Sequence, residues 1–256
     1  MPSSIRRRVK AWRTGGQHPV VVRLVAAVYR QVKELRVLVA LPFVLVQMRS
    51  TRPVRDPDAS LTLAFEGFGR TIKPLQVRHE ISGLTHAVSK QKPKRLLEIG
   101  TARGGTLFLL TRSAADDAHV LSVDLPGGWF GGGYPWWKRV LYRAFARPGQ
   151  RLDLIRADSH SQETVERVKR TLGGEPLDFL MIDGDHTYEG VKRDFESYAP
   201  LVRPGGVVAL HDIVPNRVET TSQVDRFWRE VKDGRPVKEL VADWDQSWAG
   251  IGVIRV

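Results

Sequence analysis

The feature that most constrains this chain is a repeated pattern after residue 75, in which short apolar segments alternate with amphipathic segments of helical period. Such alternation predicts a sheet built from strand–helix–strand units, an α/β fold. A glycine or a polar residue lies one or two positions after each of the first five predicted strands, and ligands of open α/β sheets bind at the carboxyl edge of their strands. We therefore expect the functional site at that edge. The predicted strands are 95–99, 120–123, 152–156, 177–182, 207–210, 237–241 and 250–256, and the predicted helices are 75–90, 105–113, 162–172, 188–198 and 224–231.

Charge divides the chain into two parts. The formal net charge is +12, and residues 1–55 hold twelve basic side chains against one acid, Glu34. The remainder is nearly neutral, with 28 basic and 27 acidic residues. A seam is predicted near Pro53, where polar residues interrupt the apolar pattern. We therefore predict a basic helical arm over 1–55 and a globular domain over 56–256.

The arm has the pattern of an amphipathic helix over 19–46, which Pro42 is expected to kink or end. Its longest uncharged apolar run, 37–46, is too short to cross a bilayer, which requires about 20 helical residues. The position of this run also disfavours a signal peptide. Two interpretations stay open: a helix packed on the body or on a second subunit of a homodimer, or an interfacial helix bound to anionic lipid. The expected location is cytoplasmic, with peripheral contact at the inner face of the membrane under the second interpretation.

The chain contains no cysteine, which excludes disulfides, zinc–thiolate sites, iron–sulfur clusters and thiol nucleophiles. One stretch, 126–148, is predicted to be irregular because glycines alternate with bulky aromatics from Trp129 to Trp137. It suits a mobile flap over a site or, equally, a surface loop anchored by its aromatics.

A glycine-rich turn, Glu98 to Thr106, follows the first predicted strand and opens a helix. Such a turn lets a ligand approach the backbone and directs helix N–H groups toward it. Asp124 ends the next strand, where a carboxylate accepts hydrogen bonds from the ribose hydroxyls of a nucleoside. Ala102 stands where a dinucleotide fingerprint has its second glycine, so a nicotinamide-dependent oxidoreductase is the weaker alternative.

In their order along the chain, these motifs resemble those of class I S-adenosylmethionine-dependent methyltransferases. The matching segments are 96–100, Asp124, 157–159, the strand into Asp183, and 200–206. The strings at 182–191 and 210–213 resemble more narrowly the methyltransferase-24 group, which is related to cephalosporin-hydroxylase-like proteins and natural-product sugar O-methyltransferases. The resemblance covers about residues 75–256.

The resemblance implies a Rossmann-like sheet of seven strands with a reversed last strand, and S-adenosyl-L-methionine as cofactor. It also implies that Gly100 and Gly104 line the methionine part and that Glu98 orients the turn. Asp124 would bind the ribose, and Asp158 with Ser159 the adenine. Thr101 and Asp183 complete the expected cofactor-binding set.

A polar cluster is predicted where two adjacent strands end. Methyl transfer to a hydroxyl requires a group that removes or screens its proton, and a carboxylate or imidazole serves. The expected order for the base is Asp185, then His186, then His211. A divalent cation such as Mg²⁺ held by Asp183, His211 and Asp212 is a further hypothesis, since related metal-dependent enzymes place carboxylates there. Helix capping by Asp183 and Asp185 is the structural alternative.

The predicted function is O-methylation of a hydroxyl on a sugar, glycolipid or secondary-metabolite acceptor. Besides the oxidoreductase, a non-catalytic basic adaptor that binds membrane or nucleic acid is an alternative. Nucleic acid is the less favoured partner, because the positive charge lies mainly outside the predicted catalytic domain.

Overall fold

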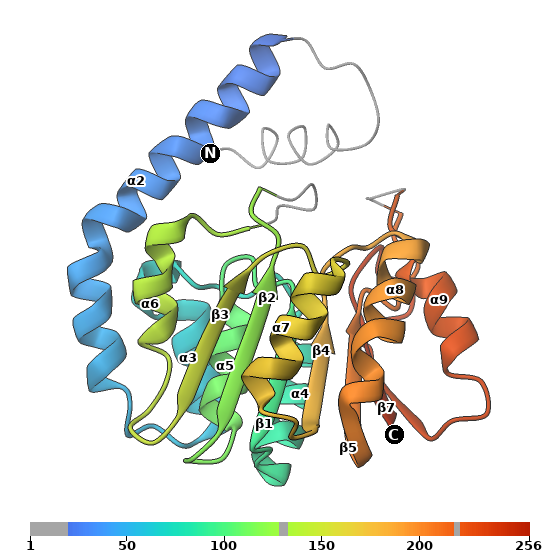
Figure 1. The fold of residues 1–256 in the computed structure, drawn as a ribbon. Helices are drawn as coiled ribbons and strands as arrows, with labels where there is room; N and C mark the ends of the chain where they lie inside the picture. The colour runs from blue at the N-terminus through green and yellow to red at the C-terminus, as the bar shows by residue number, and fades with distance from the viewer. Residues whose placement is uncertain (1–19, 128–132, 218–220) are drawn as a thin grey trace.

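A computed structural model describes residues 20–127, 133–217 and 221–256, without the side chains of residues 20–30 and Lys33. Its centre is a seven-stranded sheet with the order β3-β2-β1-β4-β5-β7-β6 (Figure 1). Strands β1 to β5 are parallel, and β7 runs antiparallel to both β5 and β6. This topology confirms the predicted fold class, including the reversed last strand. The strands are β1 Arg95–Ile99, β2 His119–Asp124, β3 Arg151–Arg156, β4 Leu177–Ile182, β5 Val202–His211, β6 Val237–Leu240 and β7 Ile251–Arg255.

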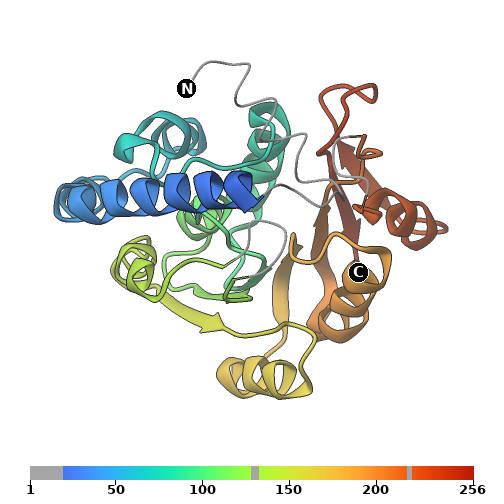
Figure 2. The same ribbon diagram turned by 90° about the horizontal axis from the view of Figure 1, so that it is seen from above.

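Helices cover both faces of the sheet, as the view from above shows (Figure 2). On one face the core joins the apolar sides of α3, α4, α5 and α6, and on the other face those of α7, α8 and α9. The strands read as continuous apolar runs because helices bury them from both sides. The helices are α3 Pro57–Glu66, α4 Arg78–Gln91, α5 Gly105–Ser113, α6 Arg139–Arg143, α7 Gln162–Leu172, α8 Tyr188–Tyr198 and α9 Val224–Val231.

The predicted amphipathic helix is α2, Val20–Ser50, and it continues through Pro42 to the predicted seam. Pro42 therefore does not end the helix. In Figure 1, α2 rises beyond the body at its N-terminal end and packs alongside the body at its C-terminal end. Val44 and Met48 are buried in the main core, and Glu34 pairs with Lys138 of the body at 2.8 Å. Within the described residues, no helix is long and apolar enough to cross a membrane.

Arg112 of α5 holds the end of α2 in place. The residue is 3% exposed, and its guanidinium donates to the carbonyl oxygens of Met48 and Thr51 at 3.2 and 2.7 Å. These are carbonyls that a helix C-terminus leaves without intrahelical donors. The second half of α2 is therefore packed as part of the body. The division at residue 55 remains a prediction, and the basic residues before position 20 lie outside the described residues.

Two short helices were not predicted. α3 begins at Pro57, and the side chain of its N-cap, Asp56, accepts from the backbone N–H of Ala59. The stretch predicted to be irregular, 126–148, contains the 3₁₀ turn η2 Trp136–Lys138 and then α6. The flap residues Trp129 and Phe130 lie outside the described residues.

Candidate functional site

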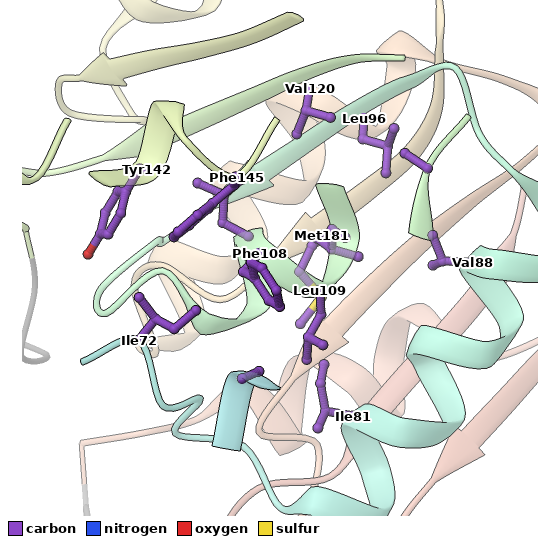
Figure 3. Packing of buried hydrophobic residues seen from close by; sticks show 14 of the residues in the cluster. Ile72, Ile81, Val88, Leu96, Phe108, Leu109, Val120, Tyr142, Phe145 and Met181 are labelled. Carbon is purple, nitrogen blue, oxygen red and sulfur yellow. The ribbon is translucent and has the colours of Figure 1, made fainter. Parts of the chain in front are cut away.

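The glycine-rich turn lies between the end of β4 and the aromatic side chains of α6. Gly100 has φ +87°, and a Cβ on it would stand 1.9 Å from the carbonyl oxygen of Asp183. Gly104 has φ +80°, and a Cβ there would stand 2.7 Å from the ring of Tyr142. Figure 3 shows Tyr142 and Phe145 in the core cluster that also contains Phe108. Both glycines are therefore required by conformation and by space.

Two buried carboxylates face this turn. Glu98 is 1% exposed, and neither of its carboxylate oxygens has a hydrogen-bond partner among the described residues. Burial raises its pKa well above the ordinary range, and the carboxylates of Asp183 and Asp124 raise it further. Asp124, at the end of β2, accepts from the backbone N–H of Ala102 at 3.1 Å. Burial raises the pKa of Asp124 to about 6, against the lowering effect of nearby backbone N–H donors.

The other expected cofactor residues lie along the same edge. Thr101 is buried and hydrogen-bonds through its hydroxyl to Ser122 of β2. Asp158, after β3, is exposed and accepts from the backbone N–H of His160 at 2.9 Å. The carbonyl oxygen of Ser159 accepts from the Tyr198 hydroxyl at 2.8 Å. The structure thus places all of these residues at or just after the carboxyl ends of β1, β2 and β3.

Four of the five predicted cluster residues come together where β4 and β5 end. Asp183 Oδ1 lies 3.1 Å from His211 Nδ1 and 3.4 Å from His186 Nε2. Asp212 Oδ2 lies 3.2 Å from His186 Nδ1, and Asp212 Oδ1 lies 3.3 Å from His211 Nδ1. Parallel register aligns Ile182 with Leu210, which brings the residues following each strand side by side. Two carboxylates and two imidazoles thus form one network.

The charges of this network favour the protonated form of His211. Burial alone lowers the pKa of His211, but the carboxylates of Asp183 and Asp212 outweigh it and raise the pKa to about 9. Burial would raise the pKa of Asp183, and the two imidazoles bring it well below the ordinary range. His211 Nε2 is buried and has no hydrogen-bond partner among the described residues. An unpaired buried polar atom is costly, so this nitrogen is a candidate contact for a ligand.

Asp185 lies apart from this network. Its Oδ1 accepts from the backbone N–H of Thr187 at 2.9 Å, and Thr187 is the N-cap of α8. A Cβ on Gly190, in the first turn of α8, would stand 2.2 Å from the Asp185 carboxyl carbon. Asp185 therefore supports the start of α8, which is the structural alternative given for it above. Asp183 is the carboxylate that contacts both imidazoles.

The predicted metal set, Asp183, His211 and Asp212, does not fit a cation. Asp183 Oδ1 is shared by the two imidazoles, and its Oδ2 accepts from Gln76 Nε2 at 2.7 Å. Asp212 Oδ1 accepts from the backbone N–H of Ala249 at 3.0 Å. Protein donors therefore occupy the oxygens that a hard cation requires. In the part of the chain that the structure describes, no group of three or more His, Cys, Asp or Glu side chains is arranged to hold a metal ion.

Sequence reasoning missed two residues of the site. Gln76 supplies the amide that fixes Asp183 and lies 107 positions before it in the chain. Tyr142 donates its hydroxyl hydrogen bond to the carbonyl oxygen of Ala102 at 2.9 Å, inside the glycine-rich turn. Neither belongs to a motif with fixed spacing from the strands. The only signal for Tyr142 was its aromatic character next to the flap region.

Comparison with known proteins identifies relatives of this chain. The family described as a methyltransferase domain, Methyltransf_24, matches at residues 97–213. An uncharacterized protein of Sinorhizobium fredii is 29% identical over 156 residues, which is 60% of this chain and 16% of that protein. A demethylmacrocin O-methyltransferase of Streptomyces fradiae is 28% identical over 116 residues, covering 38% of this chain and 28% of that protein. The chain thus spans less than a third of the length of these curated relatives.

Solved structures share the fold. The O-methyltransferase TomG of Streptomyces achromogenes, in complex with S-adenosylmethionine, superposes with a TM-score of 0.55 at 18% identity, covering 80% of this chain and 93% of that one. An O-methyltransferase of Bacillus cereus, in complex with S-adenosylhomocysteine, also has a TM-score of 0.55 at 18% identity, covering 80% and 94%. At this identity the likeness concerns the fold.

Proposed function

We propose that this chain, whose residues 97–213 match the methyltransferase-domain family, transfers a methyl group from S-adenosylmethionine to a hydroxyl of a sugar, glycolipid or other secondary-metabolite acceptor. Two curated relatives are O-methyltransferases, one of demethylmacrocin and one of mycinamicin VI, the latter 33% identical over 63 residues, which is 25% of this chain and 15% of that protein. This supports an oxygen acceptor.

The residues around the glycine-rich turn fit the cofactor. The unpartnered oxygens of Glu98 suit a cationic ligand that lies over the turn, and Asp124 is placed to accept from ribose hydroxyls. Asp158 and Ser159 follow the neighbouring strand, where the adenine would lie. The cofactor supplies an electrophilic methyl group on a sulfonium, whose positive charge also lowers the pKa of a nearby imidazole.

The observation that carries the catalytic proposal is the unpartnered Nε2 of His211, a base oriented by Asp183. Asp183 accepts from His211 Nδ1–H and so leaves Nε2 directed at the acceptor hydroxyl. The sulfonium charge of a bound cofactor would lower the pKa of His211 and favour its neutral form. In that form Nε2 would take the hydroxyl proton as the oxygen bonds to the methyl carbon, and the electron pair of the broken carbon–sulfur bond would stay on sulfur. Asp183 stabilises the imidazolium that forms. His211 thus moves ahead of Asp185 and His186 as the proposed base.

Calorimetry with S-adenosylmethionine, S-adenosylhomocysteine and NAD separates this function from its alternatives. Binding of the two sulfur nucleosides is expected; binding of NAD instead would favour an oxidoreductase, and binding of none a non-catalytic adaptor. His211→Gln should abolish transfer of labelled methyl groups to a glycoside panel while it retains affinity for S-adenosylhomocysteine. Asp185→Asn is the matched control and should retain turnover. Unchanged turnover by His211→Gln would refute the assignment of the base.

We also propose that the exposed face of α2 contacts an anionic lipid surface at the inner face of the membrane, which makes the protein cytoplasmic and peripheral. Several large apolar side chains on this helix are exposed, with Val39 at 75% and Phe43 at 66%. The surrounding arm is strongly basic, with twelve cationic residues and one acid over 1–55. Exposed apolar area next to basic charge suits a lipid interface. The exposed set is Val32, Leu35, Leu38, Val39, Phe43 and Val46.

Vesicle sedimentation tests this attachment. The intact chain should pellet with phosphatidylcholine vesicles that contain phosphatidylserine, and much less without it. The double variant Val39→Gln/Phe43→Gln should lose binding, whereas Val140→Gln, which changes a comparably exposed apolar side chain on α6, should not. Equal pelleting of both variants refutes the proposal. If light scattering shows a dimer that only the double variant loses, the face instead binds a second copy.

A further inference from the structure

A pocket of about 460 Å³ adjoins the His–Asp network. Gln76 is one of its lining residues, and the Gln76 side chain donates to Asp183, the partner of His211. Hydrogen bonds through Gln76 and Asp183 thus connect the pocket to the proposed base.

The segment that forms one wall of this pocket also touches the glycine-rich turn. A Cβ on Gly105, the first residue of α5, would stand 2.4 Å from the carbonyl oxygen of Ile72 and 2.6 Å from the backbone nitrogen of Pro74. Pro74 and Lys73 line the pocket. A ligand in the pocket therefore lies against the segment that packs on the cofactor turn, which is the placement that an acceptor requires.

The charge of the pocket is positive. Three cationic residues and one acid line it, and the acid, Glu66, pairs with Arg78 at 2.5 Å. The structure shows no ion pair between Arg70 or Lys73 and any described residue. The Lys73 ammonium lies 5.9 Å from the centre of the Phe65 ring. Two positive charges therefore remain without an anion. Cations with no protein partner beside a site are available to an anionic ligand.

Aromatic side chains line the same pocket. Phe65 is largely buried, and Trp248 lies on the chain segment between β6 and β7. Glu80 holds that segment: its carboxylate accepts from the backbone N–H groups of Ala242 and Gly250 at 3.1 and 2.9 Å. An aromatic face next to cations suits a ring that carries a negative charge.

The backbone that presents Arg70 is strained. Phe68, Gly69 and Arg70 have φ of +51°, +57° and +59° in succession, a left-handed conformation that is unfavourable for a non-glycine residue. Phe68 holds the turn because its buried ring packs edge-on against Phe108 at 5.6 Å. Strained residues held by surrounding packing are typical of ligand sites. Near the same wall α4 begins at Arg78, and its N-cap Val77 provides no side-chain hydrogen bond to the first N–H groups.

We propose that the acceptor of the methyl group carries an anionic group, a phosphate or a carboxylate, which Arg70 and Lys73 bind while its ring lies against Phe65 and Trp248. This assignment of an acceptor class rests on the proposed methyl transfer. The anchored anion fixes the orientation of the acceptor, and Gln76 links the occupied pocket to Asp183. An uncharged glycoside lacks the contact that these two cations provide.

Calorimetry in the presence of S-adenosylhomocysteine tests this inference with three probes: glucose 6-phosphate, glucuronate and glucose. At least one anionic probe should bind at least about tenfold more tightly than glucose, because one charge-assisted hydrogen bond contributes about 1.5–3 kcal/mol. Tighter binding of the phosphate or of the carboxylate identifies which anion the pocket takes. Equal binding of all three probes, or binding of neither anion, overturns the inference.

Variants locate the binding. Arg70→Gln and Lys73→Gln should each lower the affinity for the preferred anionic probe about tenfold or more and leave the affinity for glucose unchanged. Lys90→Gln, which removes an exposed cation at the far end of α4, is the matched control and should change neither. Unchanged affinity in both pocket variants overturns the assignment. Affinity for S-adenosylhomocysteine is measured separately. If the protein does not bind it, the proposed methyl transfer is contradicted; if it does, a change in probe affinity reports on the pocket alone.

Discussion

Replacing Asp183 by asparagine should lower the pKa of His211 substantially. In the native protein two carboxylates outweigh burial and raise that pKa from 6.5 to about 9, which corresponds to about 3 kcal/mol of stabilisation of the imidazolium. Asparagine keeps the shape and removes the nearer charge, which lies 3.1 Å from Nδ1. Burial then disfavours the charged ring, with Asp212 alone opposing it. We expect the pKa of His211 to fall to about 7 or below.

Proton NMR of the histidine ring Cε1–H groups measures this change directly. The chain has seven histidines, and His211→Gln identifies the relevant signal. Asp185→Asn is the control: it removes a carboxylate two residues further along the chain, which contacts the backbone of Thr187, and should leave the titration of His211 unchanged. If His211 in the native protein titrates near 6.5, or if Asp183→Asn leaves its midpoint near 9, the electrostatic reasoning is refuted.

The same shift links stability to pH. A histidine whose pKa is higher in the folded state stabilises the fold fully below its unfolded pKa, near 6.5, and this contribution is lost as the pH rises through about 9. Urea unfolding should therefore show a decrease in the free energy of unfolding of the native protein across this window. The decrease should largely vanish in Asp183→Asn. A native protein whose unfolding free energy is flat from pH 6.5 to 9.5 would contradict the shift.

Three further outcomes are expected. Affinity for S-adenosylhomocysteine should fall as the pH drops through about 6, because burial raises the pKa of Asp124 to that value and only its ionised form accepts both ribose hydroxyls; a calorimetric pH series with no change between 5 and 7 would contradict this. Glu80→Ala should lower the free energy of unfolding in urea by about 3 kcal/mol, since two backbone N–H groups lose their buried acceptor, whereas a loss below about 1 kcal/mol would show that water replaces it. Gly100→Ala should lower Tm and abolish cofactor binding because its Cβ would overlap the Asp183 carbonyl oxygen, and a native Tm would refute the packing of the turn.

Most of the fold could be predicted from hydrophobic periodicity and turn residues. The predicted bounds of α5, α7 and α8 are the observed ones. α4 begins three residues later than predicted because its N-cap, Val77, has no polar side chain to mark the start. The helix α3 was missed although Asp56 followed by a proline is a start signal, since its short apolar pattern lay outside the strand–helix repeat.

The edge of the sheet that holds the site could be predicted, but the orientation of individual side chains could not. Strand order along the chain places residues 183 and 211 side by side, because parallel strands end at one edge. Asp183 and Asp185 are both carboxylates within a short turn, and only the local backbone decides that one contacts imidazoles and the other the start of α8. Gln76 reaches the site through tertiary packing, which no local pattern encodes.

The contacts that seat α2 have a consequence for the timing of synthesis. Glu34 pairs with a lysine 104 positions later, and Met48 is held by an arginine 64 positions later. At translation rates of about 5–20 residues per second, several to roughly twenty seconds separate the emergence of the helix from that of its partners. During this interval Val44 and Met48 lack the core against which they pack in the folded protein. A helix that leaves the ribosome early is thus among the last to be packed, because the residues that seat it are synthesised after it.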